Sequence, residues 1–140
     1  MGIGLNEQAE TNEQPDTRWA ISLDWFETNN RSARLMIREY ICQNCAEELE
    51  HKKKPLTLPE LVTRVQKCAQ HTPDFINHKI PIMESIFRLF LSNGNKPLTL
   101  EEISQQLSQQ REGDSYRTSP EFLLNLLVTD RYYGLQMITE

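Results

Sequence analysis

The sequence predicts a mainly α-helical protein that ends in one short β segment. Apolar residues recur three and four positions apart along several stretches, which is the spacing of one face of a helix. Thr57 and Thr99 each precede a glutamate by three positions, the capping-box arrangement that begins a helix. Residues 132–138 combine tyrosine, leucine and isoleucine around Gly134, so they are predicted as a strand with a turn or bulge within it.

Length and composition favour one domain or two very small ones. The chain has 140 residues, of which 38% are hydrophobic, enough for a modest core. No apolar run is long enough to span a bilayer, and the amino terminus lacks the basic and apolar regions of a secretory signal. We therefore expect a cytoplasmic protein without a membrane partner.

Residues 1–17 are predicted to be a disordered acidic tail. They are rich in asparagine, glutamine and glutamate, and they lack the apolar area that would offset the entropy of ordering. Ordered structure is expected to begin at Arg18, and residues 18–79 are predicted to form one helical module.

Both tryptophans lie in residues 18–27, where two local structures compete. A partial alternation of apolar residues fits a short strand, whereas Asp24 is suited to capping a helix that begins at Trp25. In either case Trp19 and Trp25 are interpreted as an anchor packed onto the body of the protein, because each aromatic side chain removes a large area from water.

A helix capped by Ser32 is predicted next. Leu35, Met36 and Tyr40 recur at helical spacing and mark its apolar face. We expect this helix to run into Cys42.

A further helix within residues 18–79 is predicted to begin at the capping box of Thr57 and Glu60, with Pro59 in an early helical position. It is expected to continue to about Gln70 and to end before Pro73. Its apolar face consists of Leu61, Val62, Val65 and Cys68.

The cysteines and one histidine form two matched pairs, Cys42-x-x-Cys45 and Cys68-x-x-His71, with 22 residues between them. Two-residue spacers let both side chains of a pair reach one tetrahedral ion, and the pattern is similar to zinc-finger modules. Three cysteines are an odd number, which favours three thiolates and one imidazole over a disulfide framework. The sequence therefore predicts a structural zinc site, because four protein ligands leave no position for a catalytic water.

Alternatives to this ligand set stay open at the level of sequence. His78 or His51 could replace His71 as the fourth ligand. Cys68 could be a small buried apolar residue, since it shares a face with Val65. The Cys42 pair also has the spacing of a redox dithiol, although no parallel sheet is predicted to support one.

Three short helices are predicted in residues 80–140. The first follows Pro81 and stops at Asn93-Gly94-Asn95, the second follows Thr99, and the third follows Ser119-Pro120 and ends near Asp130. Their apolar faces consist of Ile82, Met83, Ile86, Phe87, Phe90 and Leu91, then Ile103 and Leu107, then Phe122, Leu123, Leu126 and Leu127.

These helices and the closing β segment, with Pro-Leu-Thr-Leu-Glu-Glu-Ile at residues 97–103, resemble a winged helix-turn-helix domain over residues 80–140. The resemblance implies that the third helix enters the DNA major groove and that the wing contacts the backbone. Here the third helix has no lysine or arginine but contains Glu121 and Asp130. Such a surface would repel a duplex and favours a protein partner, although its leucines can also be core.

Positive charge is concentrated in residues 29–54, whose six bases exceed four acids by two, while residues 80–140 sum to −3. This basic segment could hold a nucleic-acid backbone without reading sequence, or it could be a solvated face. Its bases are Arg31, Arg34, Arg38, Lys52, Lys53 and Lys54.

No catalytic motif is evident, and we expect neither an enzyme nor a small-molecule substrate. The sequence indicates a zinc-binding winged-helix adaptor or regulatory protein that acts through protein contacts. The competing hypothesis is a transcription-associated DNA-binding regulator that uses residues 31–54 and the wing.

Overall fold

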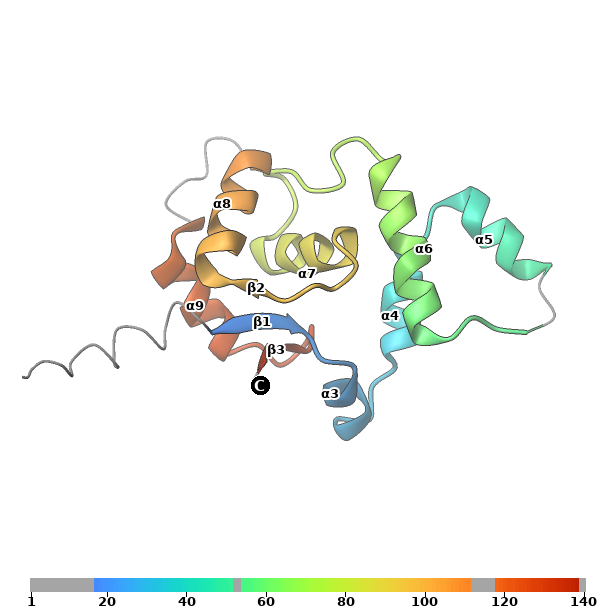
Figure 1. Ribbon diagram of the computed structural model, residues 1–140, viewed down its shortest axis with the longest axis horizontal. Helices are drawn as coiled ribbons and strands as arrows, with labels where there is room; N and C mark the ends of the chain where they lie inside the picture. The colour runs from blue at the N-terminus through green and yellow to red at the C-terminus, as the bar shows by residue number, and fades with distance from the viewer. Residues whose placement is uncertain (1–16, 52–53, 112–117, 139–140) are drawn as a thin grey trace, which may run out of the picture.

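The structure is a computed structural model that describes residues 17–51, 54–111 and 118–138. The described chain is mainly helical, with seven helices and a small three-stranded antiparallel sheet (Figure 1), which confirms the predicted mainly α class. None of these helices is both long and apolar enough to cross a membrane. The elements are β1 (Arg18–Ile21), α3 (Leu23–Thr28), α4 (Ala33–Arg38), α5 (Gln43–Glu50), α6 (Leu58–Gln70), α7 (Ile82–Ser92), β2 (Leu98–Thr99), α8 (Leu100–Gln110), α9 (Pro120–Val128) and β3 (Leu135–Ile138).

The sheet has the order β2-β1-β3, so its central strand comes from the front of the chain (Figure 1). Arg18 lies opposite Thr99 on one side and Ile138 on the other. Both structures considered for residues 18–27 occur in succession, first a strand and then a helix. The helix is capped by Ser22 and not by Asp24, because the Ser22 hydroxyl accepts from the Trp25 amide and Asp24 already lies in the first turn.

The winged-helix arrangement of residues 80–140 stays a prediction. Helices α7, α8 and α9 occur in the expected order, but the strand between β2 and β3 is β1. Within the described residues no strand follows β3 to complete a hairpin. The domain divisions at residues 17 and 79 also stay predictions, and residues 1–16 of the proposed tail lie outside the described chain.

The core is built around α7, whose Ile86, Phe87, Phe90 and Leu91 are all fully buried. Trp19 from β1 is 3% exposed and joins the same core, while Trp25 packs against it partly buried. The interpretation of the two tryptophans as an anchor is therefore confirmed. Burial of such aromatic and aliphatic area is the main favourable term in folding.

The predicted helix starts are confirmed at four hydroxyl caps. Thr57 and Thr99 form complete capping boxes with Glu60 and Glu102. The hydroxyls of Ser32 and Ser119 accept from the amides of Leu35 and Phe122, respectively. These contacts involve residues only three positions apart, so they follow from local sequence.

The helix after Ser32 is shorter than predicted, and its apolar face is different. It ends at Arg38, and a new helix, α5, begins after Cys42. Leu35 is 67% exposed, whereas Ala33 and Ile37 are buried against the core. The prediction of one helix running into Cys42 with Leu35 on its inner face was therefore wrong.

The third helix of residues 80–140 divides its leucines between core and surface. Leu123 and Leu127 are buried, whereas Leu124 and Val128 are 36% and 51% exposed. Asp130 does not contribute the predicted surface charge because it is buried beyond the helix end. Its carboxylate accepts from the backbone N–H groups of Tyr132, Tyr133 and Leu135.

Candidate metal centre

The three cysteines meet where α5 lies against α6. The Sγ atom of Cys68 is 3.0 Å from Sγ of Cys42 and 3.3 Å from Sγ of Cys45. All three sulfurs lie within 4.8 Å of one another, and all three cysteines are free. The prediction that the three cysteines lie close together is therefore confirmed.

Two helix ends position the sulfurs. Cys42 is the N-cap of α5 and Cys45 lies in its first turn, so the two-residue spacer places both side chains on one side of the helix start. Cys68 lies in the last turn of α6 and is 3% exposed. The backbone N–H of Cys42 also donates to Sγ of Cys68 at 3.2 Å.

The protonation preferences of the two closest thiols differ. The hydrogen bond from Cys68 lowers the pKa of the Cys42 thiol, and a backbone hydrogen bond lowers it further. Burial raises the pKa of Cys68 to about 12. Such an arrangement keeps a proton on Cys68 and favours thiolate at Cys42, the form that binds metals.

Arg64 lies beside the three cysteines and was not predicted as part of the site. The carboxylate of Glu48 raises the pKa of Arg64, and the thiol of Cys45 adds to the rise. Arg64 also forms an ion pair with Glu48, which joins α6 to α5 beside the sulfurs. The signal in the sequence was the four-residue spacing of Arg64 and Cys68, which places both on one face of α6.

The three cysteines could hold a metal ion, and within the described chain they form the one group of three or more cysteine, histidine or acidic ligands. A tetrahedral zinc–thiolate site, with bonds of about 2.3 Å, separates its sulfurs by about 3.8 Å. The Cys68–Cys42 and Cys68–Cys45 sulfur distances of 3.0 and 3.3 Å would therefore lengthen by about 0.8 and about 0.5 Å, respectively. No residue of α5 is fully buried, and its core packing is limited to the partly buried Leu49, so few contacts oppose that movement.

The histidines are not part of the group. His71 is the C-cap of α6, three residues after Cys68, and it is exposed. His51 is the exposed C-cap of α5. The identity of the fourth ligand therefore stays a prediction, because none of these imidazoles lies with the three sulfurs.

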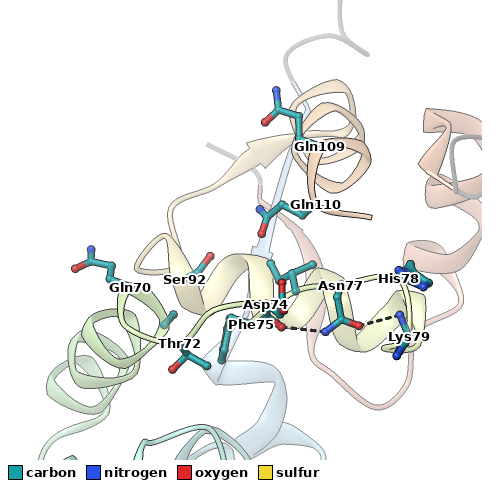
Figure 2. Close-up of a pocket in the computed structure, with 12 residues that line it drawn as sticks. Gln70, Thr72, Asp74, Phe75, Asn77, His78, Lys79, Ser92, Gln109 and Gln110 are labelled. Atoms are coloured by element: carbon teal, nitrogen blue, oxygen red, sulfur yellow. Dashed lines mark hydrogen bonds between the residues drawn. The ribbon is translucent and has the colours of Figure 1, made fainter. Parts of the chain in front are cut away.

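The third histidine, His78, lines a pocket of about 750 Å³ (Figure 2). The ends of α6, α7 and α8 and the segment 72–79 surround this cavity, and its lining is mostly polar, including Gln70, Gln109 and Gln110. The side chain of Asn77 bonds the carbonyl of Asp74 at 2.9 Å and the N–H of Lys79 at 2.8 Å, so it shapes the loop.

Comparison with protein-family models, with curated proteins and with solved structures gives no match for this chain. The arrangement of the three sulfurs is therefore the observation from which a function can be argued.

Proposed function

We propose that the protein is a non-enzymatic, zinc-stabilised adaptor or regulatory module that acts through protein contacts. The observation that carries the proposal is the convergence of Cys42, Cys45 and Cys68 from two helix ends. Thiolates on two-residue spacers are the usual ligands of structural zinc.

A structural role for the ion is supported by how α5 is held. No residue of this helix is fully buried, and the partly buried Leu49 is the α5 side chain that packs against the core, so packing contributes modestly to its attachment. The contacts that join it to α6 include the sulfur cluster and the Glu48–Arg64 ion pair. An exposed ion pair contributes about 1 kcal/mol or less, whereas zinc coordination supplies far more.

His71 is proposed as the fourth ligand. It follows Cys68 by three residues, and its exposed position at the end of α6 leaves the side chain free of core packing. With four protein ligands the ion would have no position for a water molecule, and it would stabilise the fold without catalysing a reaction.

A protein partner is supported by the outer face of α9. Leu124 and Val128 are exposed one turn apart, and Asn125 and Glu121 share the exposed surface. Groove recognition of DNA needs cationic and amide side chains that reach bases and phosphates, and α9 contains no lysine or arginine. An apolar, slightly acidic helix face is better suited to another protein.

Metal analysis of the purified full chain tests the zinc site. We expect about one zinc per chain in the wild type, and loss of both the ion and much of the thermal stability in Cys42→Ser and Cys68→Ser variants. The matched control is His51→Ala, which removes an exposed helix-end histidine and is expected to keep the ion. A wild-type protein that takes up no zinc after reconstitution under reducing conditions would contradict the proposal.

His71→Ala tests the fourth ligand in the same assay. We expect weaker zinc retention in competition with a chelator than in the wild type or in His51→Ala. If His71→Ala behaves as the wild type does, the three cysteines use another fourth ligand.

Two further assays separate the competing functions. Tight binding to mixed duplex DNA that weakens steeply with salt would support a transcription-associated regulator and contradict the adaptor. Rapid thiol-disulfide exchange by the metal-free protein, lost in Cys42→Ser, would favour a dithiol oxidoreductase.

A further inference from the structure

A small hollow lies between α4, α5, the segment 54–56 and the start of α6, and three cationic side chains line it. It has a volume of about 230 Å³ and is lined by Arg34, Arg38 and Lys54 together with Leu49, Leu56 and Leu61. Arg34 and Arg38 are four residues apart on α4, so they lie on one face of that helix. We name this site the basic hollow.

The three cations of the basic hollow differ from most other arginines of the described chain. Arg64 and Arg88 pair with glutamates, and the buried Arg111 donates to backbone carbonyls. By contrast, Arg34, Arg38 and Lys54 form no ion pair with the described residues, and no acidic side chain of the described chain lines the hollow. Three unneutralised charges around one cavity create a strongly positive local potential.

We propose that the basic hollow binds the phosphate group of an organic phosphate monoester. Two guanidinium groups and one ammonium offer more donors than a single carboxylate can accept, whereas a phosphate dianion presents three acceptor oxygens. The leucines provide apolar surface for the carbon atoms next to the phosphate. The volume equals about eight water molecules at about 30 Å³ each, which suits a phosphate and a few attached atoms.

A nucleic-acid strand fits the surroundings of the hollow less well, because backbone binding needs a track of cations for successive phosphates. Arg31 is not available to extend such a track. Its guanidinium lies 4.2 Å from the ring centroid of Tyr132, and it donates to the Tyr132 carbonyl. Helix α5, which also borders the hollow, carries Glu47, Glu48 and Glu50, and Lys52 and Lys53 lie outside the described residues.

Titration of the purified full chain at low ionic strength tests the proposal. The probes are adenosine monophosphate, adenosine and inorganic phosphate. We expect saturable one-to-one binding of the monophosphate, weaker binding of inorganic phosphate, and none of adenosine. An Arg34→Gln/Arg38→Gln double variant should weaken binding by at least about tenfold.

Lys54→Gln is a second variant, at an exposed position where the substitution should leave the fold intact, and it should also weaken binding. Lys67→Gln, which removes an exposed lysine of α6 outside the hollow, should leave binding unchanged. Equal binding by wild type and by both sets of variants would overturn the proposal. So would the absence of saturable binding of either phosphate probe to a correctly folded protein, judged by its thermal transition.

Binding experiments with other phosphate-containing ligands show whether the phosphate belongs to a lipid, a soluble molecule or a nucleic acid. Binding to phosphatidate vesicles but not to phosphatidylcholine vesicles, lost in the double variant, would support the same site with a lipid headgroup as ligand. Binding of the soluble monophosphate alone would support a soluble ligand. Tight binding restricted to a single-stranded RNA, with a salt dependence that indicates several phosphates, would overturn the single-phosphate proposal.

Discussion

The side chain of Asn95 pairs with both backbone groups of Ile21. Its Nδ2 donates to the Ile21 carbonyl and its Oδ1 accepts from the Ile21 N–H, each at 2.9 Å. The Asn95 side chain thus pairs with Ile21 as a neighbouring strand's backbone would, and it joins the end of β1 to the loop after α7. It does so at a positive φ of 63°, which asparagine tolerates better than most residues.

Asn95→Ala should destabilise the protein. It leaves two backbone groups of Ile21 without these partners and places alanine at a left-handed position, so we expect a loss of about 2–3 kcal/mol in the free energy of unfolding. Urea denaturation measures this loss. Asn125→Ala, on the exposed side of α9, is the control and should change stability by about 0.5 kcal/mol or less. Equal stability of the two variants would show that the Asn95 contacts contribute nothing.

Gly134 is required by a close contact as well as by its backbone angle. Its φ is 68°, and a Cβ atom there would lie 2.5 Å from Cε2 of the buried Phe26 ring. Gly134→Ala should therefore cost about 2–4 kcal/mol, because the ring cannot move without opening the core.

Gly94→Ala is the matched control for Gly134→Ala. Gly94 has a similar φ of 77°, but its Cβ would meet the Gln66 side chain at 3.0 Å. That flexible side chain can move, so we expect about 1 kcal/mol from backbone strain alone. Thermal denaturation of both variants should rank Gly134→Ala clearly below Gly94→Ala, and the reverse order would contradict the role of Phe26.

Arg111 fixes the segment before α7 from inside the core. It is 2% exposed, donates to Oγ of Ser85 at 2.8 Å and to the Asn77 carbonyl at 3.0 Å, and also bonds the Ile80 carbonyl. Arg111→Ala should cost about 3 kcal/mol or more, since it leaves the buried Ser85 hydroxyl and two partly buried carbonyls without these donors. Arg111→Lys should also be destabilised, because one ammonium does not reproduce the planar fork of a guanidinium.

Arg131→Ala is the control for the Arg111 variants, since it removes an exposed arginine that bonds only locally to the Asp130 carbonyl among described partners. Its effect on urea denaturation should be about 0.5 kcal/mol or less. Full stability of Arg111→Lys would indicate that the positive charge, and not the fork geometry, is what this part of the core needs.

Most of the features that the sequence predicted correctly depend on residues that are close together in the chain. The capping boxes at Thr57 and Thr99 and the placement of Cys42 and Cys45 at one helix start depend on spacings of three residues. The approach of Cys68 to that pair is a long-range contact that was inferred from metal-ligand chemistry, and His71 of the second predicted pair does not lie with the sulfurs. The strand order could not be inferred, because β1 pairs with residues far along the chain. The break after Arg38 was missed because no proline or glycine marks it, and the burial of Arg111 was missed because its partners are backbone carbonyls.

Alkaline stability should depend on Tyr133. Burial raises the pKa of its phenol above the ordinary value, and the charge of Glu84 adds to the rise. In the unfolded chain the Tyr133 phenol loses its proton at about pH 10, whereas in the folded protein it stays protonated at that pH. The unfolded state then binds fewer protons, so the free energy of unfolding falls as pH rises through this range. Stability from this group is fully present below about pH 10.

Tyr133→Phe removes the titrating group and keeps the ring that packs 5.2 Å from Phe87, measured between centroids. We expect its free energy of unfolding to decline less than that of the wild type between about pH 9 and about pH 11. Some decline should remain, because burial also raises the pKa of Tyr40. Parallel curves for wild type and Tyr133→Phe would show that folding does not hold the Tyr133 proton.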